Sequence, residues 1–152
     1  MNKYIIYTDG ACHQTTTKVG GYAAIIIDVN NNTYFELAYS ENNTTNNRME
    51  LKAVIYGLKQ IKESSEIKIV TDSQYIVNAF NKGWIYNWQK QNFINRLNND
   101  LWIELLQLVN KHKIQFYWVK GHNKHIRNER CDQLAVAASN NIILAEFRYK
   151  SL

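Results

Sequence analysis

Four acidic residues stand at positions where an ionised carboxylate is normally costly. Asp9 and Asp72 each end a short apolar run, and Glu50 and Asp132 each share a helical face with apolar residues. A charge beside a core is unfavourable unless something pairs with it. A few carboxylates, completed by water and phosphate oxygens, are what Mg²⁺ uses in proteins. If these four residues converge, they predict a magnesium site that acts on phosphates.

Two ions roughly 4 Å apart could hold both the attacking water and the leaving oxygen of a phosphodiester. Gly10 adds to this interpretation, because a missing side chain lets a phosphate or metal approach the backbone closely. Each residue alone also has a structural explanation. Asp9-Gly10 is a common strand-ending turn, and Asp72 or Ser73 could cap a following helix. Taken one at a time, these residues leave both interpretations open.

Hydrophobic periodicity predicts the elements that must position these residues. Strands are predicted at residues 3–10, 20–27, 34–39, 67–71 and 114–119, where β-branched and aromatic residues are frequent. Helices are predicted at residues 46–62, 74–80, 128–140 and from a cap at Asp100 to residue 112. The first three strands, joined by short turns, predict an antiparallel meander. The pattern indicates an α/β fold, in which strand ends and facing helices converge on one rim.

Residues 82–96, called here the basic aromatic segment, form a separate feature. It combines three cations with four aromatic side chains: Lys82, Lys90, Arg96, Trp84, Tyr86, Trp88 and Phe93. Cations suit phosphates and flat rings suit sugars and bases, so the segment is typical of nucleic-acid binding. The alternative is a small aromatic cluster beneath a solvated helical face.

Size and composition are those of one soluble domain spanning residues 1–152, with the tail at 142–152 left without an assigned structure. The net charge of +5 and the isoelectric point of about 9.1 favour a polyanionic partner. No apolar run approaches the roughly 20 residues that span a bilayer, and no signal sequence is recognised. We therefore expect a cytoplasmic monomer, with Cys12 and Cys131 as free thiols.

Five stretches resemble the motifs of a known family, type 1 ribonuclease H, in the family's order and over nearly the whole chain. They are Tyr7-Thr8-Asp9-Gly10-Ala11, Asn46-Asn47-Arg48-Met49-Glu50-Leu51, Val70-Thr71-Asp72-Ser73-Gln74-Tyr75, Trp118-Val119-Lys120-Gly121-His122 and Asn128-Glu129-Arg130-Cys131-Asp132-Gln133-Leu134-Ala135. The resemblance implies a five-stranded mixed sheet flanked by helices. It also implies endonucleolytic cleavage of the RNA strand of an RNA–DNA hybrid.

The same resemblance implies roles for individual residues. Asp9 would bridge two Mg²⁺ ions, for which Mn²⁺ could substitute, Asp132 would hold the ion that activates water, and Glu50 with Asp72 would complete the other. His122 matches the family's loop histidine, which assists proton transfer or product release.

Substrate contacts are implied in the same way. Asn46, Asn47 and Gln74 match residues that contact the minor groove of the hybrid. Glu50 and the backbone at Gly10 match the place where the family detects the RNA 2′-OH. The matches to DNA-strand contacts are Thr45, Lys82, Trp84, Trp88 and Lys90.

The sequence departs from the family pattern in three places. The connection at residues 14–19 is one residue longer than usual and lacks the usual Asn-Pro-Gly character, so no contact is carried over to it. The basic aromatic segment has only three cations, and the loop after His122 has larger residues than usual. We therefore expect hybrid affinity and loop motion to differ from the family's norm.

Three alternatives compete with this family. Integrases, transposases and resolvases share the fold but lack the glycine-histidine loop and the asparagine pair. A non-catalytic hybrid-binding domain is expected to lose a carboxylate. A zinc site is conceivable, although its spacing matches no usual pattern: it would use Cys12, His13, His122, His125 and Cys131.

Overall fold

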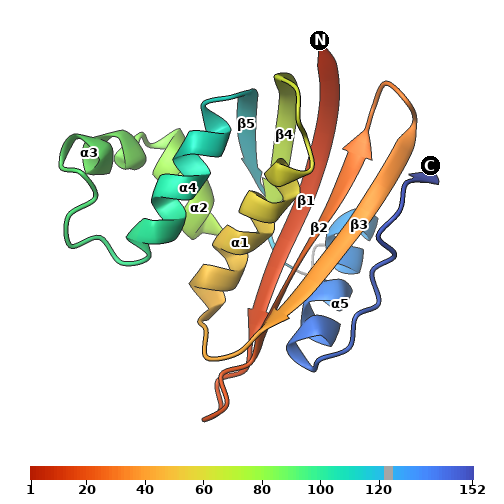
Figure 1. Ribbon diagram of the computed structural model, residues 1–152, viewed down its shortest axis with the longest axis horizontal. Coiled ribbons are helices and arrows are strands. Elements are labelled where there is room, and N and C mark those ends of the chain that lie inside the picture. Colours follow the sequence, from red (N-terminus) through yellow and green to blue (C-terminus); the bar gives the residue numbers. More distant parts are fainter. Residues whose placement is uncertain (122–124) are drawn as a thin grey trace.

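A mixed β-sheet with helices on both faces forms the body of the protein, in a computed structural model that describes residues 1–121 and 125–152 (Figure 1). The strands are β1 (Asn2–Cys12), β2 (Gly20–Asp28), β3 (Thr33–Glu41), β4 (Ser65–Thr71), β5 (Lys113–Trp118) and β6 (Lys150–Ser151). The helices are α1 (Asn46–Lys59), α2 (Gln74–Asn81), α3 (Trp84–Lys90), α4 (Asn99–Val109) and α5 (Ile126–Ser139).

The sheet has the strand order β5-β4-β1-β2-β3-β6. Strands β1, β2 and β3 form the predicted antiparallel meander, whereas β4 pairs in parallel with both β1 and β5. The α/β architecture with a mixed sheet is confirmed. The predicted number of five strands is wrong, because residues of the tail add a sixth strand that pairs with β3.

Strand β1 lies near the middle of the sheet and separates two cores. Ile6 packs with Leu58 and Trp102 in the core beneath α1, α2 and α4, and Tyr7 packs with Leu134 in the core beneath α5. Successive side chains of a strand point to opposite faces. The part of a strand that is covered on both faces is mostly apolar, which explains why Asp9, the one carboxylate of β1, is conspicuous.

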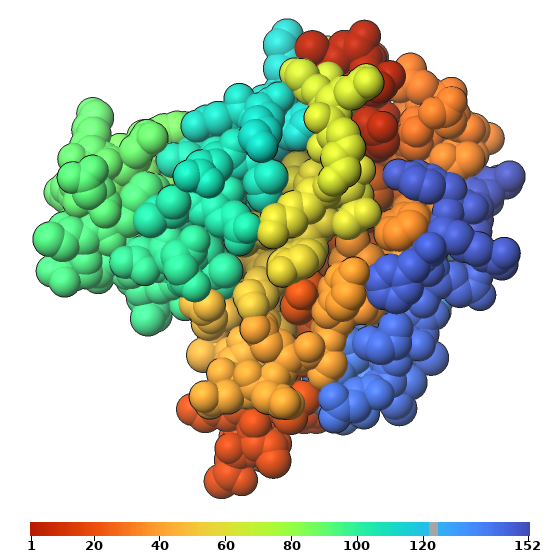
Figure 2. Space-filling model, in the orientation of Figure 1, coloured from red at the N-terminus to blue at the C-terminus, as the bar shows by residue number. Residues whose placement is uncertain are grey.

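The tail, which the sequence pattern left unassigned, packs against β3. Phe147 and Tyr149 lie against Phe35, with ring centroids 6.3 and 5.2 Å away, and Phe147 also contacts Tyr39 at 5.5 Å. The tail follows the outer side of the sheet and ends beside β3 (Figures 1 and 2). Because α1 and α5 leave this edge of the sheet uncovered, the tail provides its aromatic cover.

The start of α4 differs from the prediction. Asn98, not Asp100, is the N-cap residue, and it adopts a left-handed conformation with φ 61°. Asp100 lies in the first turn and accepts hydrogen bonds from Arg48 at 3.0 and 2.8 Å. Its carboxylate thus ties the beginning of α4 to the beginning of α1, a tertiary contact that local periodicity cannot reveal.

Among the described residues, no helix combines the length and the apolar character needed to cross a bilayer.

Candidate active site

Asp9 lies near the carboxyl end of β1, and Asp72 directly follows the parallel neighbouring strand β4. The strand predicted at residues 3–10 continues to Cys12 because its last residues pair with β2, so Asp9 lies within β1 and does not end it. The register pairs Tyr7 of β1 with Val70 of β4, and continuing it by two residues sets Asp9 beside Asp72. Glu50 faces them from the second turn of α1. Oxygen atoms of these three residues all lie within 4.8 Å of one another. The predicted convergence of Asp9, Glu50 and Asp72 is therefore present.

Gly10 explains how α1 comes so close to β1. A Cβ atom at Gly10 would lie 2.5 Å from the backbone nitrogen of Glu50 and 2.6 Å from the carbonyl carbon of Met49. Only a residue without a side chain permits this approach. The space expected for a phosphate or metal is thus occupied by α1, and the consequence is to bring Glu50 up to Asp9.

Burial and the repulsion of neighbouring charges dominate the electrostatics of Asp9 and Glu50. Asp9 and Glu50 are each only 5% exposed. Burial, followed by the charge of Asp72, raises the pKa of Asp9 to about 8. Burial and the charges of Asp9 and Asp72 also raise the pKa of Glu50 well above its usual value. Without a counter-charge, these groups are costly to ionise together.

The donor set fits a hard divalent cation. All candidate ligand atoms are carboxylate oxygens, and Glu50 Oε1 is buried without a hydrogen-bond partner among the described residues. Buried polar atoms normally have partners. A divalent ion with oxygen ligands would satisfy this atom and remove the repulsion at once.

Asp132 approaches the same place from α5. Together with Asp9 and Asp72 it borders a cavity of about 20 Å³, to which Asn128 and Glu129 of the same helix also contribute. Asp132 is not one of the three acids with oxygens within 4.8 Å of one another, but its charge adds to the raised pKa of Asp9. The carboxylate site, defined here as Asp9, Glu50, Asp72 and Asp132, therefore consists of a tight trio with a fourth acid across a small cavity.

Helix α5 places Asp132 at the border between its buried and its exposed side. Ala135, three residues later, is buried, whereas Val136, four residues later, is 43% exposed. Asn128, one turn before Asp132, is buried as well.

A polar hollow of about 270 Å³ adjoins the tight trio. Its lining combines the trio with most of the residues expected to contact the hybrid groove: Asp9, Gly10, Asn46, Asn47, Glu50, Asp72, Ser73, Gln74 and Tyr75. Asn46 and Asn47 are held in place because Thr45 caps α1, accepting a hydrogen bond from the Arg48 backbone at 3.2 Å. Ser73 caps α2 in the same way at 3.3 Å. Two helix starts therefore present these polar groups beside the carboxylates.

Comparison with known proteins agrees with this geometry. The family model described as RNase H matches residues 1–140. Ribonuclease H of Desulforamulus reducens is 44% identical over 144 residues, covering 91% of this chain and 89% of that protein. Ribonuclease H of Trichodesmium erythraeum is 47% identical over 144 residues, with 91% and 90% covered. The chain belongs to the RNase H family.

Solved structures show that the chain also shares its fold with RNase H proteins. LC9-RNase H1, described as a type 1 RNase H with the type 2 active-site motif, superposes with a TM-score of 0.84 at 26% identity, covering 100% of this chain and 78% of that one. The prototype foamy virus protease-reverse transcriptase matches with a TM-score of 0.73 at 22% identity, over 91% of this chain and 21% of that one. This second match shows a shared fold and nothing more. As an RNase H, the protein is a nuclease, and its family cleaves the RNA strand of RNA–DNA hybrids with divalent metal ions.

The basic aromatic segment of this RNase H forms a lobe at one side of the molecule (Figure 2), and its residues, 82–96, are not part of the lining of the polar hollow. Trp84 is 42% exposed and lies 5.3 Å from the Lys82 ammonium. Trp88 is half-buried, with Trp102 5.2 Å away on one side and the Arg96 guanidinium 4.2 Å away on the other. Lys82 and Trp84 are thus available for a substrate, whereas Trp88 also anchors the lobe to the core.

The loop after β5 carries His122, which lies outside the described residues, so its assignment stays a prediction. Residues on either side of the loop contact the two strands that carry Asp9 and Asp72. The Trp118 indole donates to the Asp72 carbonyl oxygen at 3.0 Å. His125 stacks on Tyr7 with ring centroids 5.0 Å apart. Both ends of the loop are therefore fixed close to the carboxylate site.

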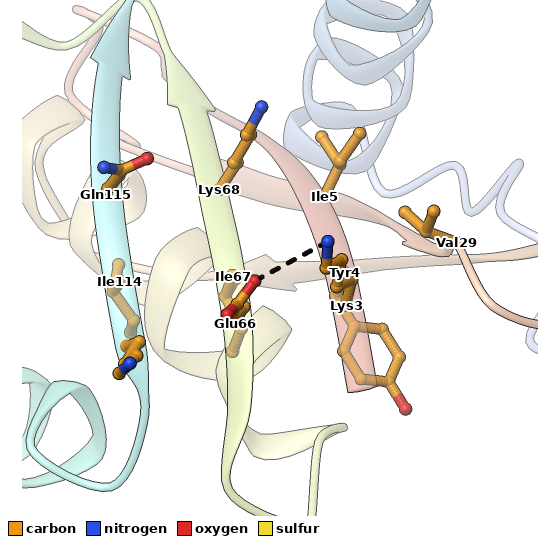
Figure 3. Close-up of a pocket in the computed structure, with 10 residues that line it drawn as sticks. Lys3, Tyr4, Ile5, Val29, Glu66, Ile67, Lys68, Ile114 and Gln115 are labelled. Carbon is orange, nitrogen blue, oxygen red and sulfur yellow. Dashed lines mark ion pairs between the residues drawn. The ribbon is translucent and has the colours of Figure 1, made fainter. Parts of the chain in front are cut away.

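A larger hollow of about 610 Å³ lies on the sheet at the opposite ends of β1, β4 and β5 (Figure 3). Its one acidic residue, Glu66, pairs with Lys3 at 4.0 Å, and Lys68 and Gln115 extend from the neighbouring strands. Ligands of α/β proteins usually bind at the carboxyl ends of the strands. This hollow lies at the amino ends and brings no acids together, so the smaller polar hollow is the better candidate.

The zinc alternative finds no support in the described part of the chain. Cys131 is buried, and its thiol donates to the Tyr7 carbonyl oxygen at 3.2 Å. Burial raises the pKa of this thiol well above its usual value, which disfavours the thiolate that zinc requires. Within residues 1–121 and 125–152, the group of potential ligands close enough to share an ion is Asp9, Glu50 and Asp72. Both cysteines are free.

Proposed function

We propose that this protein is an endoribonuclease that hydrolyses the RNA strand of RNA–DNA hybrids by two-metal-ion catalysis, leaving 5′-phosphate and 3′-hydroxyl ends. The observation that carries the proposal is the convergence of three carboxylates, two of them buried, beside a polar hollow lined by Asn46, Asn47 and Gln74. Acids alone would suit many metal enzymes. The adjoining amide groups, which can both donate and accept hydrogen bonds, provide a surface suited to a nucleic-acid groove.

The carboxylate site would hold two Mg²⁺ ions, with Mn²⁺ as a substitute. Asp9 would contribute to both positions, Asp132 to the one on the α5 side, and Glu50 and Asp72 to the other. When bound, the ions would supply an activated water and stabilise the leaving oxygen. The protein's own contribution is a preformed set of anionic oxygens, held by β1, β4 and two helices, so that little reorganisation is needed on binding.

Recognition of the RNA strand would depend on its 2′-OH groups. Glu50 and the backbone at Gly10 border the polar hollow beside the carboxylates, where a 2′-OH could be detected next to the scissile phosphate. Asn46, Asn47 and Gln74 would contact the minor groove. These contacts would distinguish ribose from deoxyribose next to the scissile phosphate.

The DNA strand would be held by groups further away. Thr45 would contact a phosphate through its hydroxyl hydrogen, which remains free because the oxygen acts as a helix cap through its lone pair. The basic aromatic segment would hold the strand through Lys82, Lys90, Trp84 and Trp88. These contacts position the substrate without taking part in the chemistry.

His122 would assist proton transfer or product release from the loop after β5. A neutral imidazole is suited to accept or donate a proton near neutral pH. The protein is proposed to act as a monomer.

The test is incubation with end-labelled RNA–DNA hybrid, duplex DNA and duplex RNA, each with Mg²⁺, with Mn²⁺ and with excess chelator. We expect cleavage of the RNA strand of the hybrid only, and only with a divalent ion. The product ends are identified by ligation and by sensitivity to phosphatase. Robust cleavage of duplex DNA, or full activity in chelator, would contradict the proposal.

A further inference from the structure

Asn128 has a buried side-chain oxygen that the fold leaves without a partner. It lies in the first turn of α5 and is 4% exposed, and its Oδ1 makes no hydrogen bond to the described residues. Leaving a buried acceptor unsatisfied costs about 1–3 kcal/mol. A structural role in capping or packing would give this oxygen a donor, so the arrangement points to a ligand.

The cavity beside Asn128 indicates what that ligand is. Its volume of about 20 Å³ is sufficient for one water molecule, which needs about 10–15 Å³. Asn128 and Asp132 are one helical turn apart, so both lie on the face of α5 that borders the cavity. Asp9 and Asp72 enclose it from the strands. A water in this position would be within reach of both the carboxylates and the amide.

We propose that Asn128 is a positioning residue of the metal centre, whose Oδ1 accepts a hydrogen bond from a water molecule bound to the divalent ion on the Asp132 side. The inference rests on the proposed two-metal function and adds to it a residue that orients the ion-bound water. A water on a divalent ion is a strong donor and needs acceptors. The amide supplies one without adding a negative charge to a site that already holds four acids.

The amide is better suited to this role than its neighbour in the sequence. Glu129 also borders the cavity but is exposed to solvent, so its carboxylate can be hydrated on its outer side. Asn128 Oδ1 is shielded from bulk water, and the residue itself lines the cavity. Groups that orient the ligands of a metal typically change its affinity by about 10–100-fold when they are removed.

The test compares thermal melts of the parent, Asn128→Leu and Asn128→Asp, each in chelator and in Mg²⁺, together with kcat and KM on a hybrid. Gln133→Leu is the matched control, because it makes the same chemical change at an exposed position of the same helix. In chelator, Asn128→Leu should melt at the parent's temperature or above it, since an unsatisfied buried acceptor has been removed. Asn128→Asp should melt lower, because it adds a fifth acid.

Mg²⁺ should reverse this order. Its stabilising effect should be smaller in Asn128→Leu, with an affinity for Mg²⁺ about tenfold weaker or more, and larger in Asn128→Asp. In Asn128→Leu, kcat should fall by about 10–100-fold while KM for the hybrid changes little. Gln133→Leu should match the parent in all of these measurements.

Two results would overturn the inference while leaving the proposed function intact. One is an Asn128→Leu variant that is destabilised in chelator and has an unchanged response to Mg²⁺, which would mean that the side chain is structural. The other is a variant indistinguishable from an active, Mg²⁺-stabilised parent. If the parent itself is neither stabilised by Mg²⁺ nor active on the hybrid, the proposed function fails and this inference fails with it.

Discussion

Glu36 and Glu50 are two equally buried glutamates with opposite electrostatic environments. Glu36, on β3, is 4% exposed and accepts hydrogen bonds from the Arg130 guanidinium at 2.8 and 3.1 Å. Burial alone would raise the pKa of Glu36, but the hydrogen bonds and charge of Arg130 outweigh it and lower the pKa. Glu50, on α1, is 5% exposed and faces two more acids, and its pKa is raised.

The difference separates a carboxylate that is paired within the fold from one that we propose for chemistry. The bidentate pair of Glu36 and Arg130 is satisfied within the chain and joins β3 to α5. Glu50 has no cationic partner among the described residues, and a bound divalent ion would supply one. Helix α5 serves both regions, because Arg130 and Asp132, two residues apart, leave it in different directions. Removing a charge should therefore have opposite consequences at the two places.

The largest effect is expected at the acid site. Asn has nearly the shape of Asp without its charge, so Asp9→Asn should preserve the strand but lose the ligand that we propose both ions share. Activity on the hybrid should fall by about 1,000-fold or more, since metal ions contribute several kcal/mol to such reactions. In chelator, the variant should melt at the parent's temperature or above it, because one of the repelling charges has been removed.

The measurement is a pair of thermal melts, with Mg²⁺ and with chelator, alongside initial cleavage rates. Mg²⁺ should stabilise the parent more than the variant, because a ligand that binds the folded state adds stability that grows with its affinity. A variant clearly less stable than the parent in chelator would mean that Asp9 serves mainly as a turn residue. The distinction between the two glutamates would then lose its basis.

The opposite outcome is expected when Arg130 is changed. Arg130→Gln leaves Glu36 buried without its cation, which should lower the free energy of unfolding by about 2 kcal/mol, less than for a fully buried pair because Arg130 is partly exposed. Cleavage at a temperature where the variant is folded should stay close to that of the parent. Denaturant unfolding followed by activity assays checks both points.

Arg148→Ala is the control for this change, because it breaks an ion pair with Glu146 that is exposed to solvent. It should leave stability and activity unchanged. If Arg130→Gln were as stable as Arg148→Ala, the ion pair between Glu36 and Arg130 would not stabilise the folded state.

The sequence predicted the carboxylate cluster better than it predicted the long-range ion pairs and the outermost strand of the fold. Asp9 and Asp72 could be placed because an acid that follows an apolar run is locally visible, and their convergence follows from parallel strands, although β1 continues to Cys12 beyond Asp9. The pairing of Glu36 with Arg130, 94 residues apart, has no local signal. The same holds for the ion pair of Asp100 with Arg48, in which Asp100 takes part from the first turn of α4 and not as its predicted cap.

The sixth strand and the role of Asn128 were missed for different reasons. Strand β6 has two residues, too few for an alternating pattern, and it forms only because the tail packs on Phe35. Asn128 was treated as the beginning of a helix. Its spacing of four residues from Asp132 was the available signal, but the amide becomes conspicuous only once its burial is known.

A smaller effect concerns the pH dependence of stability in chelator. The pKa of Asp9 is about 8 in the folded protein and about 3.9 in an unfolded chain. Between these values the folded state binds more protons, so stability should decrease as pH rises through this range. Asp9→Asn should weaken the dependence, and saturating Mg²⁺ should mask it in the parent.

Glu36 should give a pH dependence of stability with the opposite sign. Its pKa is lowered in the folded state, so the stability it contributes is present above about pH 4.3 and lost as pH falls below it. Arg130→Gln should remove this acid-side loss without changing the slope near neutral pH. Melting temperatures across the pH range, in chelator, test both variants, and parallel curves for parent and Asp9→Asn between about pH 5 and pH 8 would contradict the assignment.

The smallest effect is expected from charges that serve neither folding nor chemistry. Lys82 and Lys90 are exposed, so changing both to Ala should leave the melting temperature unchanged. It should raise KM for the hybrid a few-fold with little change in kcat, because cations that bind phosphates position the substrate. The slope of log affinity against log salt should become shallower by up to about two units, roughly one for each phosphate that is no longer neutralised. Arg96 is left in place because it packs on Trp88, and its removal would mix a structural loss with an electrostatic one.

Unchanged affinity and an unchanged salt slope would mean that the basic aromatic segment is only a packed lobe. The carboxylate site and the polar hollow would then have to account for all of the hybrid binding.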